Sequence, residues 1–290
     1  MSENIKIGVI GGDERQITVA KRLSRKYECA VWGLDEVPER AVRCGTWQSA
    51  VKGADSLILP LPVSRDGEKL NASEDVLIED IIELVSPGTL VFGGMMPSDL
   101  KSLIRERGAE YYDYYDSEVV QIKNAVPTAE GTIAAMINEM PTTLYGMSVT
   151  VTGYGRCARA LSSRLVALGA TVYVAARKES ALAWAAIEGC IPVPMGEYLF
   201  MPHDSDAIVN TVPVKLFDDN VLSGMDPKTV YFELAGGDGG IDAAAAEKYG
   251  IKVVTLHSLP GKTSPETAGD IIASELFGRL DEHFGEDVDT

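Results

Sequence analysis

Residues 147–178, MSVTVTGYGRCARALSSRLVALGATVYVAARK, decide the fold of this chain. A short β-branched run leads into Gly153 and Gly155, leucines at helical spacing follow as far as Gly169, and a second β-branched run completes the unit. In this context of strand, turn, helix and strand, the pattern G-x-G-x-x-A predicts a dinucleotide site. The first glycine makes the tight turn, the second lets backbone approach a pyrophosphate, and the small Ala158 lets the helix pack on the strand.

The residues after the second strand predict which dinucleotide binds. A free ribose 2′-hydroxyl is usually met by Asp or Glu, about 20 residues past the glycines. This chain has Arg177 and Lys178 there, followed by Ser180. Two cations and a hydroxyl suit a 2′-phosphate, so we predict NADP; the alternative is a pair of solvated charges that open a helix. The predicted cofactor residues are Gly153, Tyr154, Gly155, Arg156, Cys157, Arg177, Lys178, Ser180, Thr211, Val212 and Pro213.

The composition describes a globular protein with room for two domains. The chain has 290 residues, 46% of them apolar, and single hydrophobic cores stop growing near this length. No apolar run approaches the roughly 20 residues of a membrane span, and no signal-peptide core precedes the first strand. The net charge of −17 argues against nucleic acid or anionic membrane as partner, because phosphate surfaces recruit Lys and Arg. Four cysteines without metal or disulfide spacing favour a reducing cytoplasm.

Strands and helices alternate along the whole chain, which predicts the α/β class with two doubly wound parallel sheets. The first half begins like the second, but its turn, Gly11-Gly12-Asp13-Glu14-Arg15, lacks the G-x-G-x-x-G pattern. We therefore predict a Rossmann-like substrate domain at 1–127 that has lost its nucleotide, and an NADP-binding Rossmann domain at 128–264. A helix at 128–140 connects them, ligands bind in a cleft between them, and a C-terminal helix at 265–284 packs back on the first domain.

Several short motifs are spread over both halves of the chain. They are Ile10-Gly11-Gly12-Asp13, Pro127-Thr128-Ala129-Glu130-Gly131-Thr132, Gly153-Tyr154-Gly155-Arg156, Asn210-Thr211-Val212-Pro213, and Leu259-Pro260-Gly261 with Thr267-Ala268-Gly269. Together they resemble one family, the A subunit of dipicolinate synthase from spore-forming bacteria. The resemblance implies NADP-dependent oxidation of dihydrodipicolinate to pyridine-2,6-dicarboxylate during sporulation, together with a flavoprotein-like B subunit. It also implies an architecture like that of the D-2-hydroxyacid dehydrogenases.

The chain departs from the family pattern at two places. Gly236-Gly237-Asp238-Gly239-Gly240 replaces the usual Ser-x-Pro-Gly-Gly segment, at one edge of the implied substrate site. His257 stands where the family has no histidine, near the position of the acid–base histidine of hydroxyacid dehydrogenases. We prefer to interpret it as a partly buried, hydrogen-bonded histidine.

A substrate with two carboxylates needs cationic side chains or helix N-termini, and Arg pairs with a carboxylate through two hydrogen bonds. We expect Arg15, Ser64, Arg65, Thr128 and Thr132 to bind the substrate. Two alternatives stay open: Arg15 pairs with a neighbouring acid, and Thr128 and Glu130 merely cap the connecting helix. The candidate catalytic residues are Glu130 and Asp13 as proton acceptors and Lys262 as a carboxylate-holding cation.

Two other functions fit the same sequence. The first is a hydroxyacid or amino-acid dehydrogenase on the same scaffold, although the Arg and His–Glu set of those enzymes is missing. The second is a non-catalytic NADPH-sensing module, which would bind the cofactor without turning over a substrate. For each of these functions we also expect a homo-oligomer.

Overall fold

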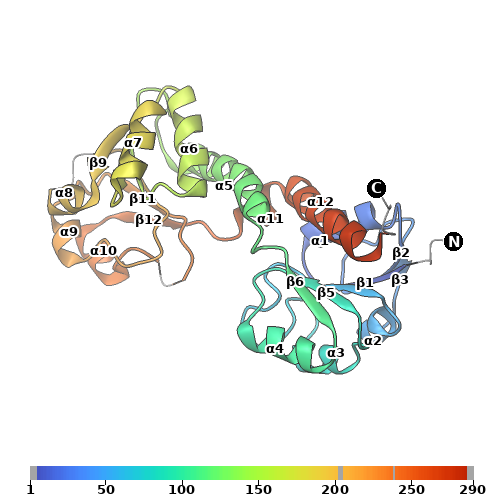
Figure 1. Cartoon of the computed structure of the whole chain (residues 1–290). Coiled ribbons are helices and arrows are strands. Elements are labelled where there is room, and N and C mark those ends of the chain that lie inside the picture. Colours follow the sequence, from blue (N-terminus) through green and yellow to red (C-terminus); the bar gives the residue numbers. More distant parts are fainter. Residues whose placement is uncertain (1–4, 202–204, 238, 286–290) are drawn as a thin grey trace. The chain divides into compact units, whose positions relative to one another are not determined.

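The computed structural model describes residues 5–201, 205–237 and 239–285, and the chain divides into two compact units (Figure 1). Unit 1 comprises residues 1–124 and 264–290, and unit 2 comprises residues 125–263. None of the helices in the described ranges combines the length and apolarity that a membrane span requires.

Unit 1 is built on a parallel sheet of six strands in the order β3-β2-β1-β4-β5-β6. Its strands are β1 (Lys6–Ile10), β2 (Glu28–Trp32), β3 (Val42–Arg43), β4 (Ser56–Ile58), β5 (Leu90–Gly93) and β6 (Glu110–Asp113). Its helices are α1 (Glu14–Leu23), α2 (Trp47–Val51), α3 (Ile78–Glu83), α4 (Ser98–Glu106) and α12 (Pro265–Phe284). Two apolar clusters pack against the sheet. One contains Ile7 and Val9 of β1, and the other contains Ile10 of the same strand.

Unit 2 repeats this plan in the order β12-β11-β10-β7-β8-β9, again with all pairs parallel. Its strands are β7 (Ser148–Thr152), β8 (Thr171–Ala176), β9 (Ile191–Pro194), β10 (Ala207–Asn210), β11 (Val230–Glu233) and β12 (Lys252–Thr255). Its helices are α6 (Arg156–Ala167), α7 (Glu179–Ile187), α8 (Met195–Phe200), α9 (Asp219–Ser223), α10 (Ala243–Tyr249) and α11 (Leu259–Thr263). Both sheets have the doubly wound strand order, so the predicted fold class is confirmed.

The C-terminal helix α12 belongs to unit 1, where it lies beside α1 (Figure 1). Ile272, Ala273, Leu276 and Leu280 of α12 are buried in the cluster that also contains Leu23 of α1. Charged pairs border this contact: Arg22 lies 2.9 Å from Asp270, and Lys26 lies 2.5 Å from Asp281. The last helix therefore completes the core of unit 1.

The connecting helix differs from the sequence-based expectation. It is α5 (Glu118–Glu139), so it begins well before residue 128 and contains Pro127 in its interior. Proline removes one helical hydrogen bond and strains the preceding turn, which is why the expected helix starts after it. Here the buried residues Val120, Ala125 and Ala129 anchor α5 on both sides of the proline, and their burial outweighs the local penalty.

Candidate dinucleotide-binding site

The turn between β7 and α6 is open at the start of the helix. Gly153 has a φ of +83°, and its N–H donates to the carbonyl of Ala175 at 2.8 Å. A side chain at Gly153 would collide with the hydroxyl of Thr211, 2.7 Å from the position of a Cβ. Gly155 caps α6 without any side-chain hydrogen bond, and a Cβ there would meet no atom within 4 Å. The turn thus offers helix N-terminal amides and free space, which fits a phosphate group.

The side chain of Tyr154 is held against the neighbouring helices. Its hydroxyl donates to Glu188 at 2.5 Å, and Glu188 also pairs with Arg159, which stacks on Trp184. Burial and the contact with Glu188 raise the pKa of Tyr154 well above 10. Arg159, with help from Tyr154, lowers the pKa of Glu188 below its usual value. Tyr154 therefore contributes to the turn through its backbone, while its side chain braces α6 against α7.

The predicted phosphate-binding cations lie at the end of β8. Arg177 follows the strand directly, Lys178 caps α7, and Ser180 lies in the first turn of that helix. All three are exposed. Within the part of the chain that the structure describes, neither cation has an acidic partner. Two exposed positive charges in a protein with a net charge of −17 are suited to an anion.

The other predicted cofactor residues line the same edge of the sheet. The hydroxyl of Thr211 donates to the carbonyl of Thr152 at 2.7 Å, which ties the end of β10 to the end of β7. Cys157 lies in the first turn of α6, where burial raises the pKa of its thiol. The carboxyl ends of β7, β8 and β10 thus bring together residues that are far apart in the sequence.

A buried polar network at the same edge was not predicted from the sequence. Glu233, the last residue of β11, is 3% exposed and accepts hydrogen bonds from the side chain of Asn210 and from the backbone of Gly240. Asn210 in turn accepts from Thr152 at 2.5 Å. The sequence feature that could have indicated Glu233 is an acidic residue at the end of an otherwise apolar strand. Position 238 of the neighbouring glycine-rich segment lies outside the described residues.

The corresponding turn of unit 1 is filled by its own side chains. Asp13 caps α1, and its carboxylate accepts from the backbone N–H of Arg15 at 3.1 Å. The guanidinium of Arg15 donates to the same carboxylate through Nε at 2.8 Å and Nη2 at 2.7 Å. Nη2 also donates to the carbonyl of Leu61 at 2.5 Å, and Arg15 is only 7% exposed. Arg15 therefore adopts the alternative that the sequence left open, an ion pair with a neighbouring acid.

A loop also covers the turn of unit 1. The N–H of Gly12 donates to the carbonyl of Asn71 at 2.8 Å, and the Asn71 side chain donates to the carbonyl of Pro62 at 3.1 Å. A Cβ on Gly11 would lie 2.9 Å from the side chain of Leu70. The loop that contains Leu70 and Asn71 therefore lies directly against the glycine turn of unit 1.

The remaining predicted substrate residues fall into both units. In unit 1, the hydroxyl of Ser64 donates to Asp66 at 3.0 Å, and Arg65 is exposed. In unit 2, Thr132 is fully buried and its hydroxyl donates to the carbonyl of Thr128 at 2.9 Å, so it is not presented to a ligand. The Thr128 side chain is buried as well.

The candidate catalytic residues of unit 2, and His257, are more accessible. Glu130 lies 3.6 Å from Arg164 and its side chain is 58% exposed. Lys262 is exposed on α11. His257 is exposed between β12 and α11, which corrects the expectation of a partly buried, hydrogen-bonded histidine.

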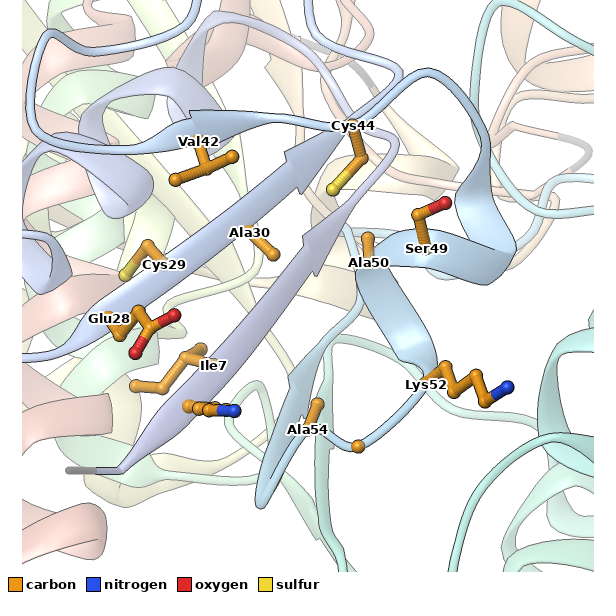
Figure 2. A pocket seen from close by; sticks show the side chains of 12 residues that line it. Ile7, Glu28, Cys29, Ala30, Val42, Cys44, Ser49, Ala50, Lys52 and Ala54 are labelled. Carbon is orange, nitrogen blue, oxygen red and sulfur yellow. The ribbon is translucent and has the colours of Figure 1, made fainter. Parts of the chain in front are cut away.

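Two cavities lie away from this edge. A cavity of about 240 Å³ borders the first residues of β1 and β2, and Figure 2 shows Ile7, Cys29 and Cys44 among its lining side chains. Burial raises the pKa of Cys29 to about 12 and also raises that of Cys44, so neither thiol is activated. A second cavity, of about 260 Å³, borders the starts of β7, β10 and β11. Ligands of open α/β sheets bind at the carboxyl ends instead, so we assign neither cavity to the site.

Two doubly wound parallel sheets, one with an open glycine turn, define an α/β protein with two Rossmann-like units. A transhydrogenase from Sinorhizobium meliloti shares this fold, with a TM-score of 0.67 and 18% identity over 95% of this chain and 93% of that one. L-alanine dehydrogenase also shares it, with a TM-score of 0.65 and 12% identity over 98% and 91%.

The chain belongs to the family of dipicolinate synthase A subunits. It is 32% identical to the dipicolinate synthase A subunit of Bacillus subtilis (strain 168) over 97% of this chain and 98% of that protein. The family model of the N-terminal domain of dipicolinate synthase A subunits matches residues 6–115. The Bacillus subtilis crystal structure superposes with a TM-score of 0.87, 31% identity and 99% coverage of both chains. The crystal structure of the dipicolinate synthase A subunit from Bacillus halodurans superposes with a TM-score of 0.86 and 29% identity, over 97% of this chain and 99% of that one. The resemblance expected from the sequence motifs is confirmed.

Proposed function

We propose that this chain is the NADP-dependent redox subunit of a dipicolinate synthase, which oxidises dihydrodipicolinate to dipicolinate (pyridine-2,6-dicarboxylate) during sporulation. The observation that carries the proposal is the difference between the two glycine turns. The turn of unit 2 is open, and the next strand is followed by Arg177 and Lys178, two cations without an acidic partner among the described residues, whereas Asp13 and Arg15 fill the turn of unit 1. Membership in the dipicolinate synthase family supports the substrate.

The residues of unit 2 divide the binding of the cofactor between them. The first-turn amides of α6, from Gly155 to Cys157, bind the pyrophosphate together with the positive end of the helix. Arg177 and Lys178 bind the 2′-phosphate, helped by the hydroxyl of Ser180. The loop after β10, which begins at Thr211, borders the nicotinamide half. The bound cofactor supplies a hydride acceptor.

Oxidation of the dihydropyridine removes one hydride and one proton, and the product ring is aromatic. Because aromatisation drives the reaction, a weak base suffices. We assign the proton to Glu130, whose carboxylate is exposed and has only a loose pair with Arg164 at 3.6 Å. Asp13 is the poorer acceptor, since both of its oxygens accept hydrogen bonds from Arg15. The exposed cations Arg65 and Lys262 remain candidates for the substrate carboxylates, and a B subunit is the proposed partner.

The decisive experiment is a pair of titrations, with NADPH and with NADH, on the wild type and on Arg177→Ala. A charge-assisted contact contributes about 1.5–3 kcal/mol, so the variant should bind NADPH on the order of 10- to 100-fold more weakly. The affinity for NADH should change little, because NADH has no 2′-phosphate. Lys228→Ala is the matched control, since Lys228 precedes β11 at the opposite edge of the sheet.

The assignment fails if the wild type binds both cofactors equally, or if Arg177→Ala weakens both alike. The reaction itself is tested by following NADPH absorbance after dihydrodipicolinate and NADP⁺ are added to the protein in complex with its B subunit. A chain that binds NADPH but turns over no substrate under these conditions would instead be a sensing module.

A further inference from the structure

The buried carboxylate of Glu233 is surrounded by neutral donors. Its Oε1 accepts from the Asn210 side chain at 2.8 Å and from the backbone N–H of Ala235 at 3.0 Å. Its Oε2 accepts from the Tyr231 hydroxyl at 3.0 Å and from the N–H of Gly240 at 2.6 Å. In the described ranges of the chain, Glu233 forms no ion pair with Lys, Arg or His. The hydrogen bonds of this buried carboxyl group are therefore satisfied by neutral donors, and no cation of the described ranges pairs with it.

These contacts connect three neighbouring strand ends with one loop. Asn210 accepts from the hydroxyl of Thr152 on β7 and from the N–H of Val212, and it donates to Glu233 on β11. Glu233 in turn receives the N–H groups at both ends of the glycine-rich loop 235–240. The carboxylate thus fixes where this loop leaves and re-enters the carboxyl edge of the sheet.

The strand order indicates which part of the cofactor lies near this loop. The winding of the sheet reverses between β7 and β10, and each side forms one mononucleotide-binding half. The cations Arg177 and Lys178 follow β8, so the adenosine half belongs on the β7–β8 side. The nicotinamide half then belongs on the side of β10 and β11, where Glu233 lies.

We propose that Glu233 is a positioning residue that fixes Ala235 and Gly240, the two ends of the glycine-rich loop, and, through its charge, makes the site favour the oxidised cofactor. The oxidised nicotinamide ring carries a positive charge and the reduced ring carries none. A carboxylate in a low-dielectric interior attracts the first and not the second. This preference suits an enzyme whose reaction starts from the oxidised cofactor. The inference rests on the proposed function, since it presupposes a dinucleotide on unit 2.

The test is the ratio of the dissociation constants of NADP⁺ and NADPH, measured by titration without substrate. Glu233→Gln keeps the shape of the side chain and removes its charge, so NADP⁺ affinity should fall on the order of 10-fold more than NADPH affinity. A substitution that only disturbed the loop would weaken the binding of both nucleotides equally and leave the ratio of their dissociation constants unchanged. Tyr231→Phe is the matched control, because it removes one donor to the same carboxylate and retains the charge.

Equal weakening of both nucleotides by Glu233→Gln would overturn the inference and leave the cofactor assignment intact. If that variant does not fold, the wild type decides: it should bind NADP⁺ at least as tightly as NADPH, and a clear preference for NADPH contradicts the inference. Failure of the wild type to bind either nucleotide would overturn the proposed function, and this inference with it.

Discussion

The turns that follow the first strand of each sheet share a backbone hydrogen bond to the neighbouring strand. They differ in the side chains that surround the start of the next helix. In unit 1, the N–H of Gly11 donates to Trp32 at 2.9 Å, and in unit 2 the N–H of Gly153 donates to Ala175 at 2.8 Å. The following helix is capped by the Asp13 carboxylate in unit 1 and by Gly155, without a side chain, in unit 2.

The difference shows that one topology can either fill the start of its first helix with side chains of the chain or leave it open. A helix N-terminus stabilises negative charge whether a ligand or the chain supplies it. In unit 1 the carboxylate is attached to the chain, always present, and fixed by the guanidinium of Arg15. In unit 2, Gly155 places no side chain at this position, which is where we propose that the pyrophosphate binds. The residue at the helix cap, Asp13 in unit 1 and Gly155 in unit 2, is therefore one of the differences between the two turns.

The largest effect is expected from copying the unit 1 cap into unit 2. Gly155 has φ −83° and ψ −168°, close to the values of −116° and −166° at Asp13, and a Cβ there is unobstructed. Gly155→Asp should therefore fold and gain a few tenths of a kcal/mol from the cap. Its carboxylate would repel the pyrophosphate, so NADPH affinity should fall on the order of 100-fold or more.

The matched control for this variant is Gly155→Ala, which adds bulk without charge and should lose much less affinity. The measurement is an NADPH titration combined with thermal melting of each variant. If Gly155→Asp retains wild-type affinity, the pyrophosphate does not bind at α6 and the comparison between the turns is wrong.

A smaller effect is expected from opening the turn of unit 1. Asp13→Ala leaves the buried guanidinium of Arg15 without its acid. Loss of one partner of a buried pair costs about 3–5 kcal/mol, but the Asp13 side chain is 37% exposed, so we expect about 2 kcal/mol. Urea unfolding measures this change, with Glu14→Ala, an exposed acid of the same helix, as the control.

NADPH affinity should not change in Asp13→Ala, since the proposed cofactor residues all belong to unit 2. A variant that loses cofactor binding while keeping its stability would move the dinucleotide site to unit 1.

The smallest effect concerns the pH dependence of the stability that comes from the pair of Arg159 and Glu188, beside the turn of unit 2. Arg159, and secondarily Tyr154, lower the pKa of Glu188, so the folded state binds this proton more weakly than the unfolded state does. The resulting stability is present above the unfolded pKa, about 4.3, and is lost as the pH falls through the lower folded value. Arg159→Ala should therefore melt at a lower temperature than wild type at pH 7, with the difference narrowing towards pH 3. If the melting temperatures of wild type and Arg159→Ala differ by the same amount at every pH from 7 to 3, the pair of Arg159 and Glu188 does not contribute to stability.

What the sequence by itself determined lies in contiguous segments. The run from the β7 strand through Gly153, Gly155 and the α6 helix to Arg177 carries its own turn geometry, helix spacing and charge. Alternating strands and helices predicted two doubly wound parallel sheets, because short crossover connections leave few other arrangements. These features depend on neighbours within one supersecondary unit, so the pattern of residues was enough to predict them.

What only the tertiary structure decided depends on residues far apart in the chain. The Arg15 side chain meets Leu61, Gly12 meets Asn71, and Asn210 meets Glu233. No local pattern states which of these partners will come together, so the sequence left the role of Arg15 open and did not identify the partners of Glu233. The helix that continues through Pro127 has the same cause, because burial against distant residues outweighs a local rule. The two turns differ in structure because the folded chain brings a carboxylate, a guanidinium and a covering loop to one of them and leaves the other open.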